Sequence, residues 1–243
     1  MKILLVNPNT TASMTEKMLI AGRSVIAAGT VLDAATATFG PESIEGYYDE
    51  VFSVPPMLDA IKAAGAVDGV VIGCFDDTGV DAARCLINAP VIGICQAAMQ
   101  AASILAGTFS VVTTLRRSVP ALEGLARKYG FAAQCRAIRA AEIPVLSLEE
   151  PGSQARARIG AEIEIALRQD RAEAIVLGCA GMADLANELS DEFGVPVIEG
   201  VTAAVKCIEG LAAIGLATSS VGGYAKPRAK SYLGEFQRFA PES

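Results

Sequence analysis

Two cysteines hold the positions best suited to chemistry in this 243-residue chain. Cys74 follows the apolar run of "VVIGCFDDTG" (70–79), and Cys179 follows that of "EAIVLGCAGMAD" (173–184). A thiolate can remove a proton from carbon, and a thiol can deliver one. The chain contains no histidine, which excludes Ser-His and Cys-His nucleophile systems and imidazole acid–base catalysis. Proton transfer must therefore fall to cysteine, aspartate, glutamate, lysine or tyrosine.

Two aspartates stand beside the first of these cysteines. Carboxylates near a thiol oppose its ionisation, since like charges disfavour each other. We expect a helix N-terminus after each cysteine to lower the thiol pKa through its dipole and free N–H groups. Asp77 suits the N-cap of a helix beginning near Thr78. For Asp76, helix capping and contact with a ligand both stay open.

The two cysteines belong to an internal repeat. The offset between repeats is 179 − 74 = 105 for the cysteines, 196 − 90 = 106 for two prolines, and 109 − 2 = 107 for the first strands. The repeat predicts two similar α/β halves, with each cysteine directly after a strand. Ligands of open α/β sheets bind beyond the carboxyl ends of the strands. If a pseudo-two-fold axis relates the halves, the two thiols face each other across a cleft. We expect the other cysteines to be small buried hydrophobes: Cys85, Cys95, Cys135 and Cys207.

Short apolar runs alternate with longer segments of helical periodicity. The predicted strands span residues 3–6, 31–38, 69–73, 91–94, 109–113, 131–138, 174–178 and 195–198. The predicted helices include residues 11–27, 54–64, 80–87, 120–129, 154–169 and 182–193. This alternation predicts mainly parallel sheets covered by helices on both faces. We predict a first α/β domain of residues 1–98 with the tail 205–243 packed back on it, and a second of residues 99–204.

The composition excludes several classes of protein. A formal net charge of −7 argues against a nucleic-acid or anionic-membrane partner. The apolar run in the start "MKILLVNPNT" is too short for the hydrophobic region of a signal peptide, and no later apolar run is long enough to span a bilayer. We therefore expect a cytoplasmic protein. The six cysteines form no CxxC pair, so we expect free thiols and neither a disulfide framework nor a metal site.

Several longer motifs point to one family. The segments "NPNT" (7–10), "SIEGYYDE" (43–50), "GCFDDTG" (73–79), "VVTTLRRSVP" (111–120), "LGCAGM" (177–182) and "GYAKPR" (223–228) together resemble the hydantoin racemases of the Asp/Glu racemase superfamily. The resemblance runs nearly end to end, and allantoin racemases are the closest sister group. It implies an Asp/Glu racemase-like fold with the active site between two domains, and a homo-oligomer. It also implies cofactor-independent racemisation at C5 of 5-monosubstituted hydantoins, with Cys74 and Cys179 as the two bases.

The resemblance also helps to interpret the residues around the cysteines. Amino-acid racemases of this superfamily follow the first cysteine with Asn-Thr, which helps to bind a substrate carboxylate. The acidic pair found here would repel such a carboxylate, whereas a neutral cyclic imide offers N–H donors that carboxylates accept. Thr113 and Thr114 carry hydroxyls suited to a carbonyl or enolate oxygen. The expected substrate contacts are Asn9, Ile44, Phe75, Asp76, Thr113, Thr114 and Gly181.

Some of these residues have an equally good structural interpretation. Asn9 could cap the helix that follows it, and Ile44 and Phe75 could belong to the core instead of lining a pocket for the 5-substituent. Gly181 would let the backbone approach the ring closely. Glu199 could lie near the cleft or form a structural ion pair.

Other functions stay open at this point. The nearest is an allantoin racemase of purine catabolism, since allantoin is a hydantoin with a ureido substituent. Maleate isomerase-like chemistry, in which a cysteine attacks an alkene, is a further option. Arylmalonate decarboxylase fits less well because that relative keeps one of the two cysteines. A two-domain binding protein for a small molecule would not require two cysteines at equivalent strand ends.

Overall fold

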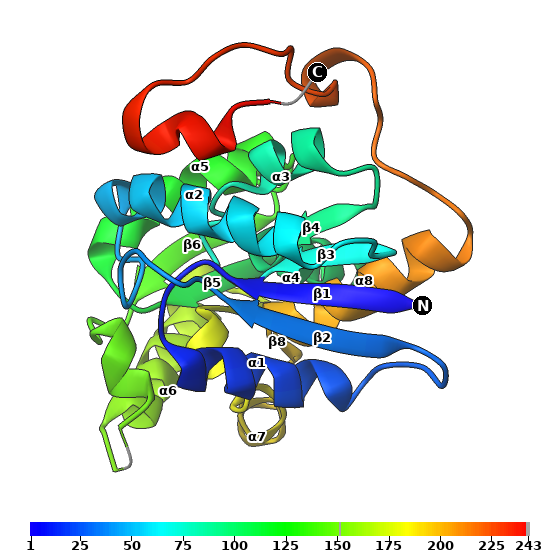
Figure 1. Ribbon diagram of the computed structural model, residues 1–243. Coiled ribbons are helices and arrows are strands. Elements are labelled where there is room, and N and C mark those ends of the chain that lie inside the picture. The colour runs from blue at the N-terminus through cyan, green and yellow to red at the C-terminus, as the bar shows by residue number, and fades with distance from the viewer. Residues whose placement is uncertain (151, 242–243) are drawn as a thin grey trace.

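The computed structural model describes residues 1–150 and 152–241, which fold around two four-stranded parallel sheets (Figure 1). The strand orders are β2-β1-β3-β4 and β6-β5-β7-β8, so the second sheet repeats the first strand for strand. Every recorded strand pair is parallel. The predicted class, two similar α/β halves with mainly parallel sheets, is confirmed. The strands are β1 (Lys2–Asn7), β2 (Val31–Thr36), β3 (Gly69–Ile72), β4 (Val91–Gly93), β5 (Phe109–Thr113), β6 (Cys135–Ala140), β7 (Ala174–Gly178) and β8 (Val197–Ile198).

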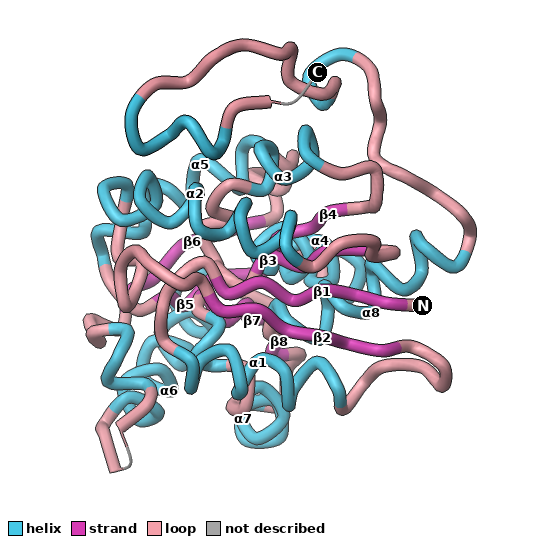
Figure 2. The backbone as a smooth tube through the Cα atoms, viewed as in Figure 1, coloured by secondary structure: helices cyan, strands magenta, loops and turns pink. Residues whose placement is uncertain are grey.

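Helices surround both sheets in Figure 2. The α-helices are α1 (Ala12–Arg23), α2 (Tyr47–Ala63), α3 (Val80–Leu86), α4 (Ile94–Leu105), α5 (Val119–Lys128), α6 (Ala155–Ile165), α7 (Ala186–Phe193) and α8 (Gly200–Ala213). Short 3-10 turns span Arg116–Ser118, Val145–Leu148, Ala180–Met182, Gly222–Tyr224 and Gly234–Phe239, and a π-helical turn, Ala166–Asp170, extends α6.

The observed boundaries differ from the predicted ones mainly at the ends of elements. Helix α2 begins at Tyr47 and not at residue 54, because acidic residues in its first turn suit the positive end of a helix. Strand β6 begins at Cys135 and not at residue 131, because the preceding residues form a turn in which the Gln134 N–H donates to the Phe131 carbonyl. The helix predicted from residue 182 begins at Ala186, after a 3-10 turn.

Helices α4 and α8, which the sequence did not predict, join the two halves. Helix α4 follows β4 of the first sheet but packs on β7 of the second, whereas α8 follows β8 and packs on β3. The two helices also pack on each other, and a Cβ at Gly200 would collide with the Ile94 carbonyl oxygen. One buried cluster therefore contains side chains from both sheets, including Val71 and Phe109.

The chain after α8 crosses the first half, where the tail lies above α2 and α3 in Figure 1. The Thr218 N–H donates to the Asn88 carbonyl at 2.7 Å, and Arg84 lies over the Tyr224 ring at 5.4 Å. Arg238 pairs with Asp59 of α2 at 3.2 Å. The domain boundaries at 98/99 and 204/205 stay a prediction, and residues 151 and 242–243 of those ranges lie outside the described residues.

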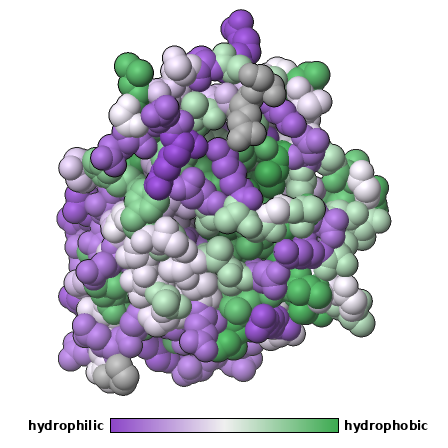
Figure 3. Space-filling view, in the orientation of Figure 1, coloured by the Kyte–Doolittle hydropathy of each residue, from purple (hydrophilic) through white to green (hydrophobic). Residues whose placement is uncertain are grey.

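The surface mixes polar and apolar side chains over the face shown in Figure 3. Large exposed apolar side chains include Tyr48, Val51, Ile104, Leu233 and Phe236. Over the described parts of the chain, 1–150 and 152–241, no helix is both long enough and apolar enough to cross a lipid bilayer.

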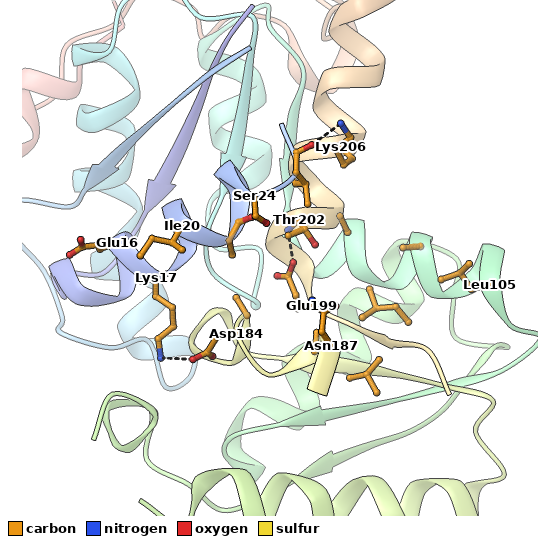
Figure 4. A pocket seen from close by; sticks show the side chains of 18 of the residues that line it. Glu16, Lys17, Ile20, Ser24, Leu105, Asp184, Asn187, Glu199, Thr202 and Lys206 are labelled. Atoms are coloured by element: carbon orange, nitrogen blue, oxygen red, sulfur yellow. Dashed lines mark hydrogen bonds and ion pairs between the residues drawn. The ribbon is translucent and has the colours of Figure 1, made fainter. Parts of the chain in front are cut away.

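A buried carboxylate caps the N-terminus of α8. Both oxygens of Glu199 accept backbone hydrogen bonds, from the Val201 N–H at 2.6 Å and the Thr202 N–H at 2.7 Å. Figure 4 shows this side chain turned toward the start of its own helix. Because backbone N–H groups at a helix start lack partners within the helix, such a cap stabilises it. The Glu199 carboxylate thus caps its own helix, where we had expected a position near the cleft or an ion pair. It does not line the pocket that contains the two cysteines.

A different residue caps α4. Gly93 occupies the position equivalent to Glu199, and the Asp77 carboxylate fills the space that its side chain would take. Asp77 accepts from the Cys95 N–H at 2.9 Å, the Gln96 N–H at 3.0 Å and the Tyr129 hydroxyl at 2.7 Å. The last bond links the turn after β3 to α5 of the second half.

The expectation that Asp77 caps the helix directly after it is therefore wrong. Helix α3 begins at Val80 with Gly79 as its N-cap, and no side chain bonds that cap. Asp77 has the left-handed φ of 48°, a conformation that aspartate tolerates better than most residues. Its carboxylate reaches α4 instead.

We predict that Asp77→Ala and Glu199→Ala each lower the free energy of unfolding by about 1–3 kcal/mol, because each leaves two buried backbone N–H groups without an acceptor. Urea denaturation followed by circular dichroism measures the change. Asp191→Ala, which removes an exposed acid of α7, is the matched control and should stay within about 0.5 kcal/mol of the wild type. Equal stability of the Asp77 and Asp191 variants would contradict the cap.

Candidate active site

The carboxyl ends of the inner strands β1, β3, β5 and β7 meet at a small pocket of about 40 Å³ that both cysteines line. Residues from each strand end contribute, as expected for ligand sites of open α/β sheets. The structure brings all nine predicted site residues together in this one pocket: Asn9, Ile44, Cys74, Phe75, Asp76, Thr113, Thr114, Cys179 and Gly181. Their roles in catalysis and binding stay predictions.

A wider groove of about 840 Å³ lies between α1, α4, α7 and α8 (Figure 4). Some of its polar side chains are engaged elsewhere. Lys17 lies 3.9 Å from Asp184, and Glu199 is committed to its helix cap. Neither cysteine lines the groove. The smaller pocket is therefore the better candidate for chemistry.

Glycine precedes each cysteine because the adjacent space is occupied. A Cβ at Gly73 would lie 2.6 Å from the Met18 sulfur, and a Cβ at Gly178 would lie 2.8 Å from the Thr113 Cβ. The Thr113 hydroxyl also donates to the Gly178 carbonyl at 3.0 Å. These close approaches hold the ends of the strands together, and so they fix where each thiol enters the pocket.

Burial dominates the acidity of Cys74. It raises the pKa of the Cys74 thiol well above its ordinary value, and the negative charge of Asp76 raises it further. The Thr78 hydroxyl, 3.4 Å from the sulfur, and the Asp76 backbone N–H oppose this by donating hydrogen bonds. The charge of Cys179 raises the pKa again, so ionisation of one thiol disfavours ionisation of the other.

Cys179 has a related environment with a nearby cation. Burial raises the pKa of its thiol to about 11, while the Gly181 N–H and the charge of Lys17 lower it. Lys17 lies 3.0 Å from Glu149, whose charge has the opposite effect. A backbone N–H after each cysteine lowers the thiol pKa, as expected, but burial outweighs this effect, so the net shift at each sulfur is upward.

Asn9 is held by its carbonyl end. Its side-chain oxygen accepts from the Asn7 amide at 2.8 Å and the Thr11 N–H at 2.9 Å. Thr11 is the N-cap residue of α1, so Asn9 does not have that position. The Asn9 amide contacts only the weak acceptor Met14 sulfur at 3.5 Å within the described residues. It can therefore donate to a carbonyl oxygen in the pocket.

The sequence analysis did not predict six residues that line the pocket: Met14, Gly73, Ser118, Val145, Gly178 and Ala180. Ser118 precedes α5 as its N-cap residue, yet its side chain makes no capping bond. Ser118 lies in the same loop after β5 as Thr114, and this position could have indicated that it lines the pocket. Gly181 lines the pocket, but a Cβ there would meet Leu148 at 2.9 Å, so that packing contact is the reason for glycine.

The described residues contain no cluster of three or more cysteine, aspartate or glutamate side chains placed to hold a metal ion. The polar groups of the pocket are two thiols, one carboxyl, hydroxyls and an amide. Such a set can move protons and bind carbonyl and N–H groups.

We predict slow alkylation of both pocket cysteines at neutral pH, because the thiolate is the reactive form and burial disfavours it. Iodoacetamide labelling followed by peptide mass spectrometry should show rates at Cys74 and Cys179 that rise about tenfold per pH unit between pH 7.5 and 9.5. Saturating hydantoin should protect these two cysteines and leave the half-buried Cys85 unprotected. Rapid labelling at pH 7.5, or no protection, would contradict the assignment.

Comparisons with known proteins identify the family of the chain. A model of the Asp/Glu/Hydantoin racemase family matches residues 3–208. The chain is 52% identical to hydantoin racemase from Rhizobium meliloti, over 96% of this chain and 98% of that protein. The solved allantoin racemase from Klebsiella pneumoniae is 44% identical with a TM-score of 0.96, covering 99% of each chain. Maleate cis-trans isomerase from Nocardia farcinica shares the fold alone. It is 20% identical, with a TM-score of 0.64, and the match covers 88% of this chain and 92% of that protein. These matches confirm the predicted resemblance and fold class.

Proposed function

The chain belongs to the Asp/Glu/Hydantoin racemase family and is an isomerase of the racemase type, and from that premise we propose that it inverts C5 of 5-monosubstituted hydantoins without a cofactor. The observation that carries this proposal is the presence of Cys74 and Cys179, from equivalent strand ends of the two halves, in one pocket. Two acid–base groups that approach a carbon from opposite faces can invert it.

In the proposed reaction, the thiolate of one cysteine takes the C5 proton and the thiol of the other delivers its own proton to the opposite face. One S–H bond forms and one breaks, so the pair ends with its protonation states exchanged. The electrons of the broken C–H bond spread onto the neighbouring carbonyl oxygen as an enolate. The Asn9 amide and the Thr114 hydroxyl are the proposed donors to that oxygen.

The electrostatics support a pair with one thiolate. Each sulfur is buried, and the charge of Cys179 raises the pKa of Cys74. Lys17 favours the charged form of Cys179, so we propose that Cys179 ionises before Cys74. Because burial raises the pKa of Cys179 to about 11, its thiolate is a minor form at neutral pH. A neutral substrate adds no further charge to the pocket, whereas an amino-acid carboxylate would.

The two candidate substrates, a 5-substituted hydantoin and allantoin, differ in the substituent at C5. The side chains of Met14, Ile44, Phe75 and Val145 give the pocket an apolar wall, which favours an apolar substituent and thus a hydantoin. Allantoin is the second candidate, favoured by the near-complete superposition on an allantoin racemase. Maleate isomerase-like chemistry has only the shared fold in its support.

We further propose a homo-oligomer located in the cytoplasm with no nucleic-acid or membrane partner. The exposed apolar side chains of α2 and the tail support self-association, and the net charge of −7 disfavours polyanionic partners. Light scattering after size exclusion should give at least twice the mass of one chain.

We predict that Cys74→Ser and Cys179→Ser each reduce racemisation at least about 100-fold, because one base cannot both remove and deliver the proton across the ring. Polarimetry with both enantiomers of 5-isobutylhydantoin measures this loss. Proton NMR in heavy water follows C5 exchange, and a single variant can still exchange the enantiomer whose base it keeps. Cys85→Ser, outside the pocket, is the control with full activity.

Normal racemisation by both pocket variants would remove the thiols from the mechanism. Dependence on an added metal or on pyridoxal phosphate would refute the cofactor-free reaction. A higher kcat/KM for allantoin than for 5-isobutylhydantoin would assign the second substrate.

A further inference from the structure

Three buried carboxyl oxygens make no hydrogen bond among the described residues, and one of them, Oε1 of Glu149, has an ion pair with Lys17 at 3.0 Å. The other two are Oδ2 of Asp76 and Oε1 of Glu50. A buried polar atom without a partner destabilises the fold, so such atoms are rare in folded proteins. Asp76 lines the cysteine pocket, where a ligand can supply the missing partner.

Glu50 reaches this region from α2. The side chains of Glu50, Val54 and Met57 follow one another at i, i+4 and i+7, so they share one face of the helix. Val54 and Met57 lie 3.2 and 2.6 Å from where a Cβ of Gly79 would sit, which places this face against the turn after β3. Glu50 extends the same face, and its charge acts on Asp76.

The acid that acts most strongly on Asp76 is Glu50, which does not itself line the pocket. Asp77 acts less strongly, and its carboxylate accepts hydrogen bonds from α4. The ionisable groups that act with Asp76 are Glu50 on α2, Asp77 and Cys74 in its own turn, Cys179 after β7 and Cys95 on α4. All of these are acids. Burial, then Glu50, then Asp77 raise the pKa of Asp76 to about 7.

Building on the proposed function, we propose that Asp76 binds the H–N–C=O edge of a cyclic ureide as a neutral carboxylic acid, and that Glu50 keeps it neutral. The acid O–H donates to the ring carbonyl, and the acid carbonyl accepts from the ring N–H, so both groups find partners in one contact. An ionised Asp76 has no donor for the carbonyl. An amino-acid carboxylate has no N–H and C=O edge of this kind.

The same contact removes the conflict between Asp76 and Cys74. The negative charge of Asp76 raises the pKa of the Cys74 thiol, and a neutral Asp76 removes this contribution while that of burial remains. Asp76 is thus a binding residue that selects a neutral ring, and Glu50 is a positioning residue that acts through it.

The test is the affinity for unsubstituted hydantoin, measured by calorimetry between pH 6 and 8, where hydantoin keeps its N–H protons. For the wild type, the Kd should rise about tenfold across this range as Asp76 loses its proton. Asp76→Asn keeps a donor and an acceptor without a titrating proton, so its Kd should match the wild-type value at pH 6 and stay constant.

Glu50→Gln should shift the midpoint of this change to lower pH, because it removes one charge that raises the pKa of Asp76. In the Asp76→Asn background the same change should have no effect on binding. Asp59→Asn, which removes a charge from α2 at its contact with Arg238, is the control and should leave the wild-type curve unchanged.

A wild-type Kd that stays constant between pH 6 and 8, or tight binding by Asp76→Leu, would overturn the role of Asp76. Racemisation of 5-isobutylhydantoin by the same wild-type sample keeps the proposed function separate. If racemisation persists while the binding curve is flat, only the role of Asp76 fails. If the wild type neither racemises the substrate nor binds hydantoin, both proposals fail. Circular dichroism of each variant confirms folding.

Discussion

The cost of removing charge from water governs this pocket. Burial is the largest influence on Cys74, Cys179, Asp76 and Asp77, and in each case it favours the uncharged form. A site of this kind can hold one negative charge more easily than two. The proposed chemistry has the same character, since a neutral ring enters and a single charge passes between sulfur, carbon and sulfur. Neighbouring acids, which first look opposed to thiol catalysis, then become donors once they keep their protons.

The fold makes this burial possible by exchanging helices between its halves. Helix α4 leaves the first sheet to cover the second, and α8 does the reverse, so the ends of the inner strands are held on both sides. The hydrogen bond from Tyr129 to Asp77 ties the turn that carries Cys74 to the other half. The pocket is thus a product of the joined halves and belongs to neither one.

Much of this arrangement could be predicted from the sequence. The shared offset of 105–107 residues placed Cys74 and Cys179 at equivalent strand ends, and strand ends of parallel sheets converge. For the same reason Asn9, Thr113 and Thr114 were expected at the pocket they line. The largely apolar run of β5 and the uninterrupted one of β7 were correctly predicted as strands, because both strands are buried on both faces.

Other features depend on packing that the sequence does not display. The left-handed φ of Asp77 sends its carboxylate to α4, and local sequence patterns gave no sign of this turn. Glu50 was overlooked because the predicted helix began at residue 54, whereas α2 begins at Tyr47. The direction in which the thiol pKa values shift depends on burial, which follows from tertiary contacts.

The two unequal caps have a consequence for how the halves diverged. In the cap of α4, Asp77 supplies the carboxylate and Gly93 leaves room for it. In the cap of α8, the residue equivalent to Asp77 is Met182, and Glu199, at the position equivalent to Gly93, supplies the carboxylate. A carboxylate can occupy that space from either position but not from both, so a side chain at position 93 could arise only after Asp77 had been replaced.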